Sequence, residues 1–460
     1  MAKNDTDRTT GEEVALTLAA FAWKTLCTWW VTLSWGALFV FAYQEAFLWF
    51  PILALAAVGA CSWWRGGVWR LAVPFWGDAL RIHSRRTRRK ELSRGNQWLR
   101  DAGLVSVGDE TVHEARLQVG EDWEVLTAAP IPGVSPARWS EAAEQFRGLR
   151  NAAIVEADAL PDGVMRVTFY RSDALDEPWI LDAPPAVDLD TMSVEAARNR
   201  AGAPVPITFK EQAALLAGGI GGSGKTAGLA TMLSAFAQHP EDVELTILDG
   251  KAGTDWQPFA PVARRYLTIA DTSDLRQARD ILAEAVEEMT HRVATSQEAL
   301  HCSNFWKASA AARRAASRPW KVIVIDECQE LFTGAVPKSN KEAREIAAEN
   351  EQLVTTLIKR GRSAGITLIL LTQKPTTDSI PSGARDNAGL KIGFRVETKE
   401  AEKAILGTSP DDPSAPSATA IPRSRVGGAV LVSDRGVREN VRFGYLDEHK
   451  IRSILRGEDD

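Results

Sequence analysis

Apolar and polar positions divide the chain into two unlike parts. The first part holds two uncharged runs, Thr25 to Tyr43 and Ala46 to Trp64, and each is long enough for a helix to cross a ~30 Å hydrocarbon core. Beyond residue 90, apolar runs are short and alternate with polar helical patterns, as in domains that fold in water. With 460 residues the chain is too long for one core, so we expect a membrane hairpin followed by further domains.

The flanks of the two uncharged runs favour a membrane location. Tryptophans stand near the run ends, where an interfacial belt would place them: Trp23, Trp29, Trp30, Trp49, Trp63 and Trp64. Basic residues follow the second run: Arg65, Arg70, Arg81, Arg85, Arg86, Arg88, Arg89 and Lys90. These residues predict two spans with both termini in the cytoplasm and a location in the inner (plasma) membrane. A buried hairpin of a soluble domain and a DNA-binding role for the basic cluster stay open as alternatives.

The second part of the chain alternates between strand and helix patterns. Predicted strands cover Ala213 to Ala217, Val243 to Leu248, Lys321 to Ile325, Thr367 to Leu371 and Lys391 to Val396, and predicted helices cover Ala227 to Ala235 and Leu275 to Leu300. Such alternation indicates an α/β domain with a parallel sheet. An earlier helix at 136–150 and a strand at 164–170 suggest a smaller α/β domain.

These patterns predict five segments. They are a cytoplasmic segment at 1–24, a transmembrane hairpin at 25–64, a basic juxtamembrane segment and linker at 65–130, a small α/β domain at 131–204 and an ATPase domain at 205–460. The net charge of −6 excludes no partner. The four cysteines lack metal or disulfide spacing, which fits a reducing cytoplasm.

The first strong motif is a phosphate loop between a predicted strand and a predicted helix. It reads Gly219-Ile220-Gly221-Gly222-Ser223-Gly224-Lys225-Thr226. Glycines let consecutive backbone N–H groups converge on phosphates, and the helix N-terminus adds favourable partial charge. We expect ATP here, with Lys225 on the outer phosphates and Thr226 on Mg²⁺.

The second motif closes the apolar run at Ile325 with Asp326 and Glu327. At the carboxyl end of a central strand, Asp326 would hold Mg²⁺ and Glu327 would activate the attacking water. Gln373 follows the next predicted strand, and we expect it to sense the γ-phosphate; a solvated turn glutamine is the alternative.

Several motifs together resemble the FtsK/SpoIIIE-type DNA translocases. They are the phosphate loop, Leu248 to Lys251, Ile325 to Glu327, Lys359 to Ile366, Thr372 to Pro375 and Ile392 to Val396. The resemblance covers about 134–454 and implies a RecA-like P-loop NTPase fold that acts as a hexameric ring on double-stranded DNA. It also implies that an arginine from a neighbouring subunit stabilises the γ-phosphate charge, with Arg360 and Arg362 as candidates and Arg395 after them. A surface role is the alternative for each of these arginines.

The single ATPase domain and the short N-terminal anchor resemble the TraB-type transfer proteins of actinomycete conjugative elements. Accessory transfer or DNA-recognition proteins would then be further partners. Three departures from the larger family members stand out. Few residues follow Tyr445, which leaves little room for a winged-helix DNA reader; Gly250 replaces a proline; and Cys328-Gln329-Glu330 is more polar than usual. We expect the last two to leave the phosphate chemistry untouched.

The expected activity is therefore ATP-driven movement of double-stranded DNA during conjugative transfer. Lys338 and Lys341, in a polar stretch after the second motif, are candidates for phosphate-backbone contacts, and Lys251 is the next. A solvated surface loop is the alternative for this stretch. Three alternatives stay open: a division-type DNA pump, a protein-secretion ATPase of the same superfamily, and a membrane scaffold that binds nucleotide without hydrolysing it.

Overall fold

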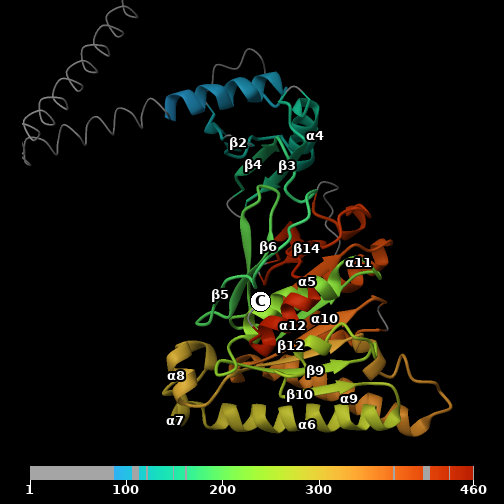
Figure 1. Ribbon diagram of the computed structural model, residues 1–460. Coiled ribbons are helices and arrows are strands. Elements are labelled where there is room, and N and C mark those ends of the chain that lie inside the picture. Colours follow the sequence, from blue (N-terminus) through green and yellow to red (C-terminus); the bar gives the residue numbers. More distant parts are fainter. Residues whose placement is uncertain are drawn as a thin grey trace, which may run out of the picture. The chain divides into compact units, whose positions relative to one another are not determined.

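The computed structural model describes residues 88–458, except 106–112, 121–122, 149, 161–162, 377–378, 408–414 and 435. The predicted spans at 25–64 and the basic segment as far as residue 87 lie outside the described residues. Across the described ranges, no helix is both long and apolar enough to span a bilayer. Residues 90–460 form one compact unit that contains two sheets (Figure 1).

The first sheet has four antiparallel strands in the order β1-β2-β4-β3. Its strands are β1 (Ala115–Val119), β2 (Trp123–Ala128), β3 (Ile154–Ala159) and β4 (Met165–Tyr170). Helix α4 (Pro136–Phe146) and the helical residues 88–101 supply its core. There Trp98 stacks on Trp139 with ring centroids 6.1 Å apart, and both side chains are buried. This sheet therefore has a hydrophobic core of its own.

The second sheet has eleven strands, which run β10-β9-β11-β12-β8-β13-β14-β15-β6-β5, with β7 paired to β6. Its strands are β5 (Val187–Asp188), β6 (Ser193–Arg198), β7 (Pro204–Thr208), β8 (Ala214–Gly218), β9 (Val243–Asp249), β10 (Arg265–Thr268), β11 (Trp320–Asp326), β12 (Ile366–Thr372), β13 (Leu390–Phe394), β14 (Gly428–Val432) and β15 (Arg438–Phe443). Strands β8 to β13 run parallel to one another, whereas β14 pairs antiparallel with both β13 and β15. The predicted α/β fold with a parallel sheet is confirmed.

Helices cover both faces of the parallel strands. The larger ones are α5 (Lys225–Ala237), α6 (Thr272–Ala294), α9 (Lys341–Arg360) and α12 (Glu448–Arg456), and the shorter ones are α7 (Ser296–Leu300), α8 (Ala310–Ala315), α10 (Ser382–Asn387) and α11 (Lys399–Leu406). Helices α5 and α12 pack on one face, and α6 and α9 pack on the other. Successive β11 residues therefore enter different cores: Val324 faces the first and Ile325 the second. Burial on both faces explains the unbroken apolar runs of these strands.

The two sheets do not follow the predicted boundaries at residues 131 and 205. Strands β1 and β2 precede residue 131, yet they pair within the first sheet. Strand β6 precedes residue 205, yet it pairs with β15 of the second sheet. A short strand carries no local signal for its partner, because pairing depends on segments far away in the chain.

Candidate nucleotide-binding site

The phosphate loop joins β8 to α5, as its sequence context predicts. Gly222 and Gly224 have φ of 74° and 91°, the left-handed region that glycine adopts without steric cost. A Cβ atom on Gly224 would lie 2.5 Å from the Gly427 nitrogen. The Gly427 N–H donates to the Ser223 carbonyl oxygen (2.9 Å), so a turn about two hundred residues later in the sequence stabilises the loop.

The loop is also fixed by the two strands beside β8. The Gly219 N–H donates to the Thr372 carbonyl oxygen at the end of β12 (3.2 Å), and the Ile220 N–H donates to the Arg395 carbonyl oxygen after β13 (3.0 Å). Strand β12 lies between β8 and β11. The phosphate loop and the end of β11 are therefore separated by a single strand, and that strand contacts both.

A buried lysine and two buried carboxylates form the centre of the site. The Lys225 Nζ atom lies 3.4 Å from Asp326 Oδ1 and 3.7 Å from Glu327 Oε1. The exposed fractions of these side chains are 3%, 0% and 9%. The phosphate loop and the end of β11, about a hundred positions apart in the sequence, thus meet in one charged cluster.

Both carboxylate oxygens of Asp326 accept hydrogen bonds from protein donors. Its Oδ1 accepts the Glu327 N–H (3.0 Å), and its Oδ2 accepts the Trp256 indole N–H (2.8 Å). Trp256 is fully buried and carries no motif signal, so sequence reasoning missed it. Asp249 stands beside Asp326 in register, and burial raises the pKa of its carboxyl group. The Gly250 N–H donates to the Asp326 carbonyl oxygen (2.9 Å), a bond that proline could not make.

The two oxygens of Glu327 have different environments. The backbone of this residue is left-handed (φ 45°), which turns the chain sharply after β11. Oε2 accepts the Gln373 backbone N–H (2.9 Å) and the Gln329 side-chain N–H (2.8 Å). Oε1 is buried and has no hydrogen-bond partner. The η3 turn (Cys328–Leu331) folds the Gln329 side chain back onto this carboxylate. One of the polar residues after Glu327 therefore lies in the site, which the sequence did not predict.

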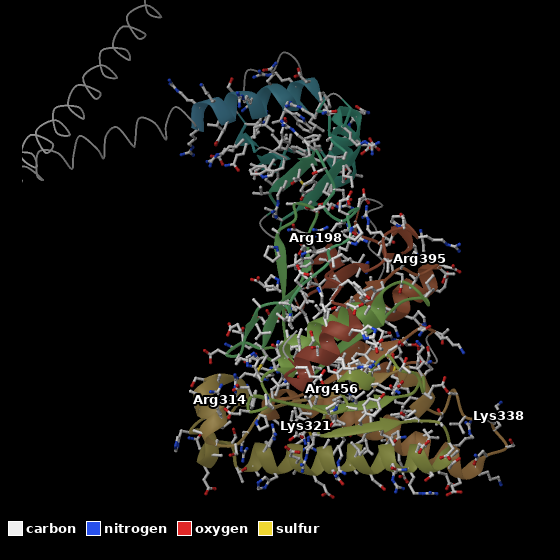
Figure 2. All side chains as sticks on the ribbon, in the orientation of Figure 1. Arg198, Arg314, Lys321, Lys338, Arg395 and Arg456 are labelled. Atoms are coloured by element: carbon white, nitrogen blue, oxygen red, sulfur yellow. The ribbon has the colours of Figure 1, made fainter. Side chains whose placement is uncertain are left out.

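The other predicted site residues lie outside this charged cluster. Gln373 follows β12, and its Oε1 would lie 3.3 Å from a Cβ atom on Gly221, so its side chain lies against the phosphate loop. Lys338 and Lys341 are exposed at the turn that leads into α9, and Figure 2 shows Lys338 at its outer end. Lys251 is paired with Asp255 (2.6 Å), a bond that raises the pKa of the lysine.

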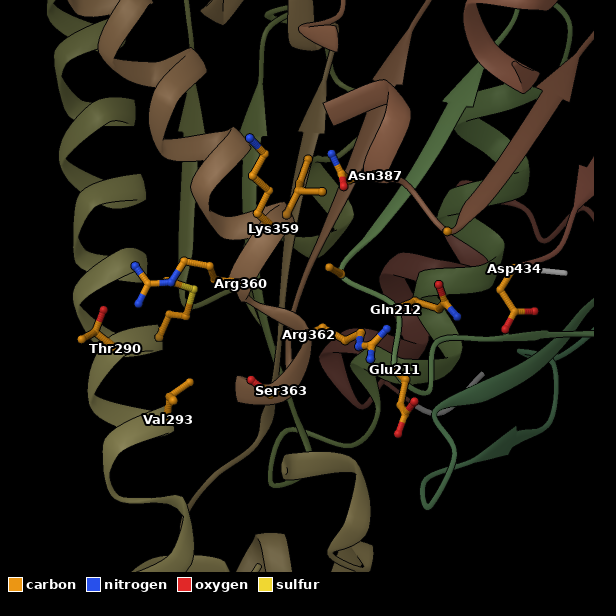
Figure 3. Close-up of a pocket in the computed structure, with 14 residues that line it drawn as sticks. Glu211, Gln212, Thr290, Val293, Lys359, Arg360, Arg362, Ser363, Asn387 and Asp434 are labelled. Atoms are coloured by element: carbon orange, nitrogen blue, oxygen red, sulfur yellow. The ribbon is translucent and has the colours of Figure 1, made fainter. Parts of the chain in front are cut away.

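The candidate arginines Arg360 and Arg362 lie at the opposite edge of the sheet. They precede β12, whereas the phosphate loop follows the end of its parallel neighbour β8. Both line a cavity of about 770 Å³ together with Lys359, Glu211 and Asp434 (Figure 3). These arginines are therefore placed away from the phosphate loop of their own chain. Arg395, by contrast, follows β13 at the same edge as the loop.

The residues present fit a nucleotide triphosphate with Mg²⁺. The loop glycines leave backbone N–H groups accessible, the Ser223 hydroxyl is buried without a hydrogen-bond partner, and Thr226 lies in the first turn of α5. Within the part of the chain that the structure describes, no group of three His, Cys, Asp or Glu side chains could hold a metal alone. Nucleotide-bound Mg²⁺ takes most of its ligands from water and phosphates, so Thr226 and Asp326 would suffice. A cavity of about 140 Å³ beside Thr226, lined also by Phe259, offers room for part of a nucleoside.

Comparisons with known proteins agree with this geometry. Residues 183–305 match the FtsK/SpoIIIE family. The DNA translocase FtsK of Leptospira interrogans is 28% identical over 223 residues, which are 47% of this chain and 22% of that protein. FtsK of Helicobacter pylori is 26% identical over 221 residues, which are 47% of this chain and 24% of that protein. The alignments thus span about a quarter or less of these relatives.

A solved structure has a similar fold over most of the chain. It is the pCW3 conjugation coupling protein TcpA, in monomer form with ATPγS, at a TM-score of 0.53 and 16% identity. The likeness covers 80% of this chain and 100% of that chain. At this identity the likeness concerns the fold alone. Together with the geometry of the phosphate loop, these comparisons lead to one conclusion: residues 183–305 match the FtsK/SpoIIIE family, and they belong to an α/β domain that contains a phosphate loop.

Proposed function

We propose that this protein is a membrane-tethered ATPase that translocates double-stranded DNA. One observation carries the hydrolytic part of this proposal. Lys225 of the phosphate loop lies within 3.7 Å of Glu327 Oε1, a buried carboxylate oxygen without a hydrogen-bond partner. A protein that only binds nucleotide needs the lysine but has no use for such an oxygen. The scaffold alternative is therefore disfavoured.

The side chains of the site divide the work of ATP hydrolysis. The loop N–H groups and Lys225 bind the phosphates. Thr226 and Asp326 would hold Mg²⁺, which would supply neutralisation of the charge that develops on the phosphate oxygens. Glu327 accepts a hydrogen bond from the attacking water through Oε1 and orients it in line with the γ-phosphate. Gln373, beside Gly221, is placed to respond to the presence of that phosphate.

A ring of subunits would complete the site. The family resemblance favours six subunits. Arg360 and Arg362 precede β12, at the edge of the sheet away from the phosphate loop. An arginine at this edge could reach a γ-phosphate only across a subunit interface. The cavity that they line would then receive the nucleotide-binding edge of a neighbour. Arginines supplied in this way stabilise the transition state of phosphoryl transfer.

The membrane tether and the role in conjugation rest on separate arguments. The uncharged runs at 25–64 support a tether in the inner membrane, and the basic residues that follow them support a cytoplasmic position of the ATPase domain. The fold likeness to a conjugation coupling protein supports transfer of DNA between cells, with accessory transfer proteins as partners. A division-type DNA pump and a protein-secretion ATPase use the same chemistry, so the substrate has to be tested directly.

Stimulation of ATP turnover by DNA is the decisive measurement. The full-length protein should hydrolyse ATP faster with linear duplex DNA than without it, and Lys225→Ala should abolish both rates. Turnover that does not respond to DNA would favour protein export. Turnover that is absent in the wild type would favour the scaffold. Conjugative transfer and segregation at division would then be compared in cells that carry Glu327→Gln.

A further inference from the structure

We propose that Gln329 is a positioning residue for Glu327. Its side chain would hold one carboxylate oxygen so that the other faces the attacking water, and it would link this orientation to the end of β12. The inference rests on the proposed ATPase function, because it assigns a partner to the base of that reaction.

Gln329 lies in a continuous chain of hydrogen bonds. The Lys374 backbone N–H donates to Thr372 Oγ1 (3.0 Å), and the Thr372 hydroxyl donates to Gln329 Oε1 (2.8 Å). The Gln329 Nε2 atom then donates to Glu327 Oε2 (2.8 Å). Thr372 is fully buried, and Gln329 and Glu327 are each 7% exposed. Water has little access to any of these bonds.

The donor-to-acceptor direction of these hydrogen bonds fixes the orientation of the Gln329 amide. The Thr372 hydroxyl accepts from a backbone N–H, so its single proton is available to donate to the Gln329 carbonyl oxygen. The amide nitrogen must then face Glu327, whose ionised carboxylate can only accept. A flipped amide would set the Gln329 carbonyl oxygen against the Glu327 carboxylate, so that two acceptors would face each other. The chain therefore has one satisfied arrangement.

This arrangement distinguishes the two oxygens of Glu327. Oε2 receives two hydrogen bonds, from Gln329 and from the Gln373 backbone, whereas Oε1 receives none. Without the Gln329 amide, one hydrogen bond from the Gln373 N–H and the longer ion pair with Lys225 would be left to oppose rotation of the carboxylate. A rotated carboxylate would present its oxygens to the water in varying directions, and catalysis depends steeply on such alignment.

The same chain reaches the phosphate loop. The Thr372 hydroxyl donates to Gln329, and the Thr372 carbonyl oxygen accepts the N–H of Gly219 at the start of the loop (3.2 Å). Gln329 thus connects the carboxylate after β11 to a strand end that is also bonded to the loop. A displacement of the loop would thus reach Glu327 through Thr372 and Gln329, in addition to its direct contacts with the Gln373 N–H and Lys225.

Steady-state kinetics of the full-length protein tests this inference. Gln329→Met keeps the length of the side chain and removes both hydrogen bonds. It should lower kcat for ATP by about 10- to 100-fold and leave the Kd for ATPγS unchanged, because Gln329 orients the base without touching nucleotide in this proposal. Thr372→Val removes the hydrogen bond to Gln329, one step further from Glu327, and should give a smaller loss of kcat. Asn350→Leu, which removes a buried amide bonded to the Leu331 carbonyl oxygen, is the matched control and should keep wild-type kcat.

A double variant separates positioning from a merely structural role. In a Glu327→Gln background the base is already lost, so adding Gln329→Met should cause no further drop in single-turnover rate. An additive drop, an equal loss in Asn350→Leu, or a wild-type kcat in Gln329→Met would each overturn the inference while wild-type turnover upholds the proposed function. If the wild type shows no turnover beyond that of Lys225→Ala, both the function and the inference fail.

Discussion

Replacing Lys225 with methionine should destabilise the protein even before any nucleotide is added. The ammonium group is the cation that lies between Asp326 and Glu327, and all three side chains are at least nine-tenths buried. Methionine has nearly the same length, so the loss of packing should cost less than about 1.5 kcal/mol. The variant nevertheless leaves two buried carboxylates without their cation.

The expected loss follows from the burial of these charges. Removing one partner of a buried ion pair typically costs about 3–5 kcal/mol, because the remaining charge stays desolvated. We therefore expect Lys225→Met to lower the free energy of unfolding by about that amount. The double variant Lys225→Met/Glu327→Gln removes one of the two uncompensated charges and should recover part of the loss. Glu327→Gln alone keeps the Lys225 to Asp326 pair and should unfold close to the wild type.

Denaturant unfolding of residues 90–460, which form one compact unit, measures these differences. Saturation with ATPγS at a hundred times its Kd should stabilise the wild type and Glu327→Gln by about 2.7 kcal/mol, and Lys225→Met by nothing. The reasoning is refuted if Lys225→Met unfolds within about 1 kcal/mol of the wild type. It is equally refuted if the double variant is no more stable than Lys225→Met, since the cost would then not arise from charge.

Four further changes probe other parts of the reasoning. Glu327→Gln should retain ATP in equilibrium binding and lower turnover by about 10²- to 10⁴-fold; loss of binding would contradict its assignment to water. Replacing Lys338 and Lys341 by Ala should reduce the slope of log affinity for DNA against log salt by about one unit per lost contact, with unstimulated turnover unchanged; an unaltered slope would remove both from the DNA path. Arg362→Ala subunits mixed with Glu327→Gln subunits should regain turnover that neither variant has alone, because the first supplies Glu327 and the second supplies Arg362 at a shared interface. Absence of recovery would argue against an arginine acting between subunits. Burial raises the pKa of Asp249, so its contribution to stability is present at low pH and lost as pH rises. Asp249→Asn should therefore stabilise the protein at pH 7, and thermal unfolding should show this gain shrinking as pH falls toward about 4.

The local sequence determined the nucleotide-binding elements of this protein. Consecutive glycines before Lys225 predict a loop that binds phosphate, and the apolar run that ends at Asp326 predicts a buried central strand. Both features depend on neighbours within a few residues, through backbone freedom in one case and burial on both faces in the other. The structure accordingly has β8, the loop, α5 and β11 within a residue or two of their predicted positions.

Only the tertiary structure decided how these elements meet. The sequence does not show that β12 separates β8 from β11, that β6 joins β15, or that the Trp256 indole donates to Asp326. It also does not show that Gln329 turns back onto Glu327. Each of these contacts joins segments through strand pairing or through a turn whose direction depends on the surrounding packing. Local patterns specify which residues form an element, whereas the burial of the whole sheet selects which elements become neighbours.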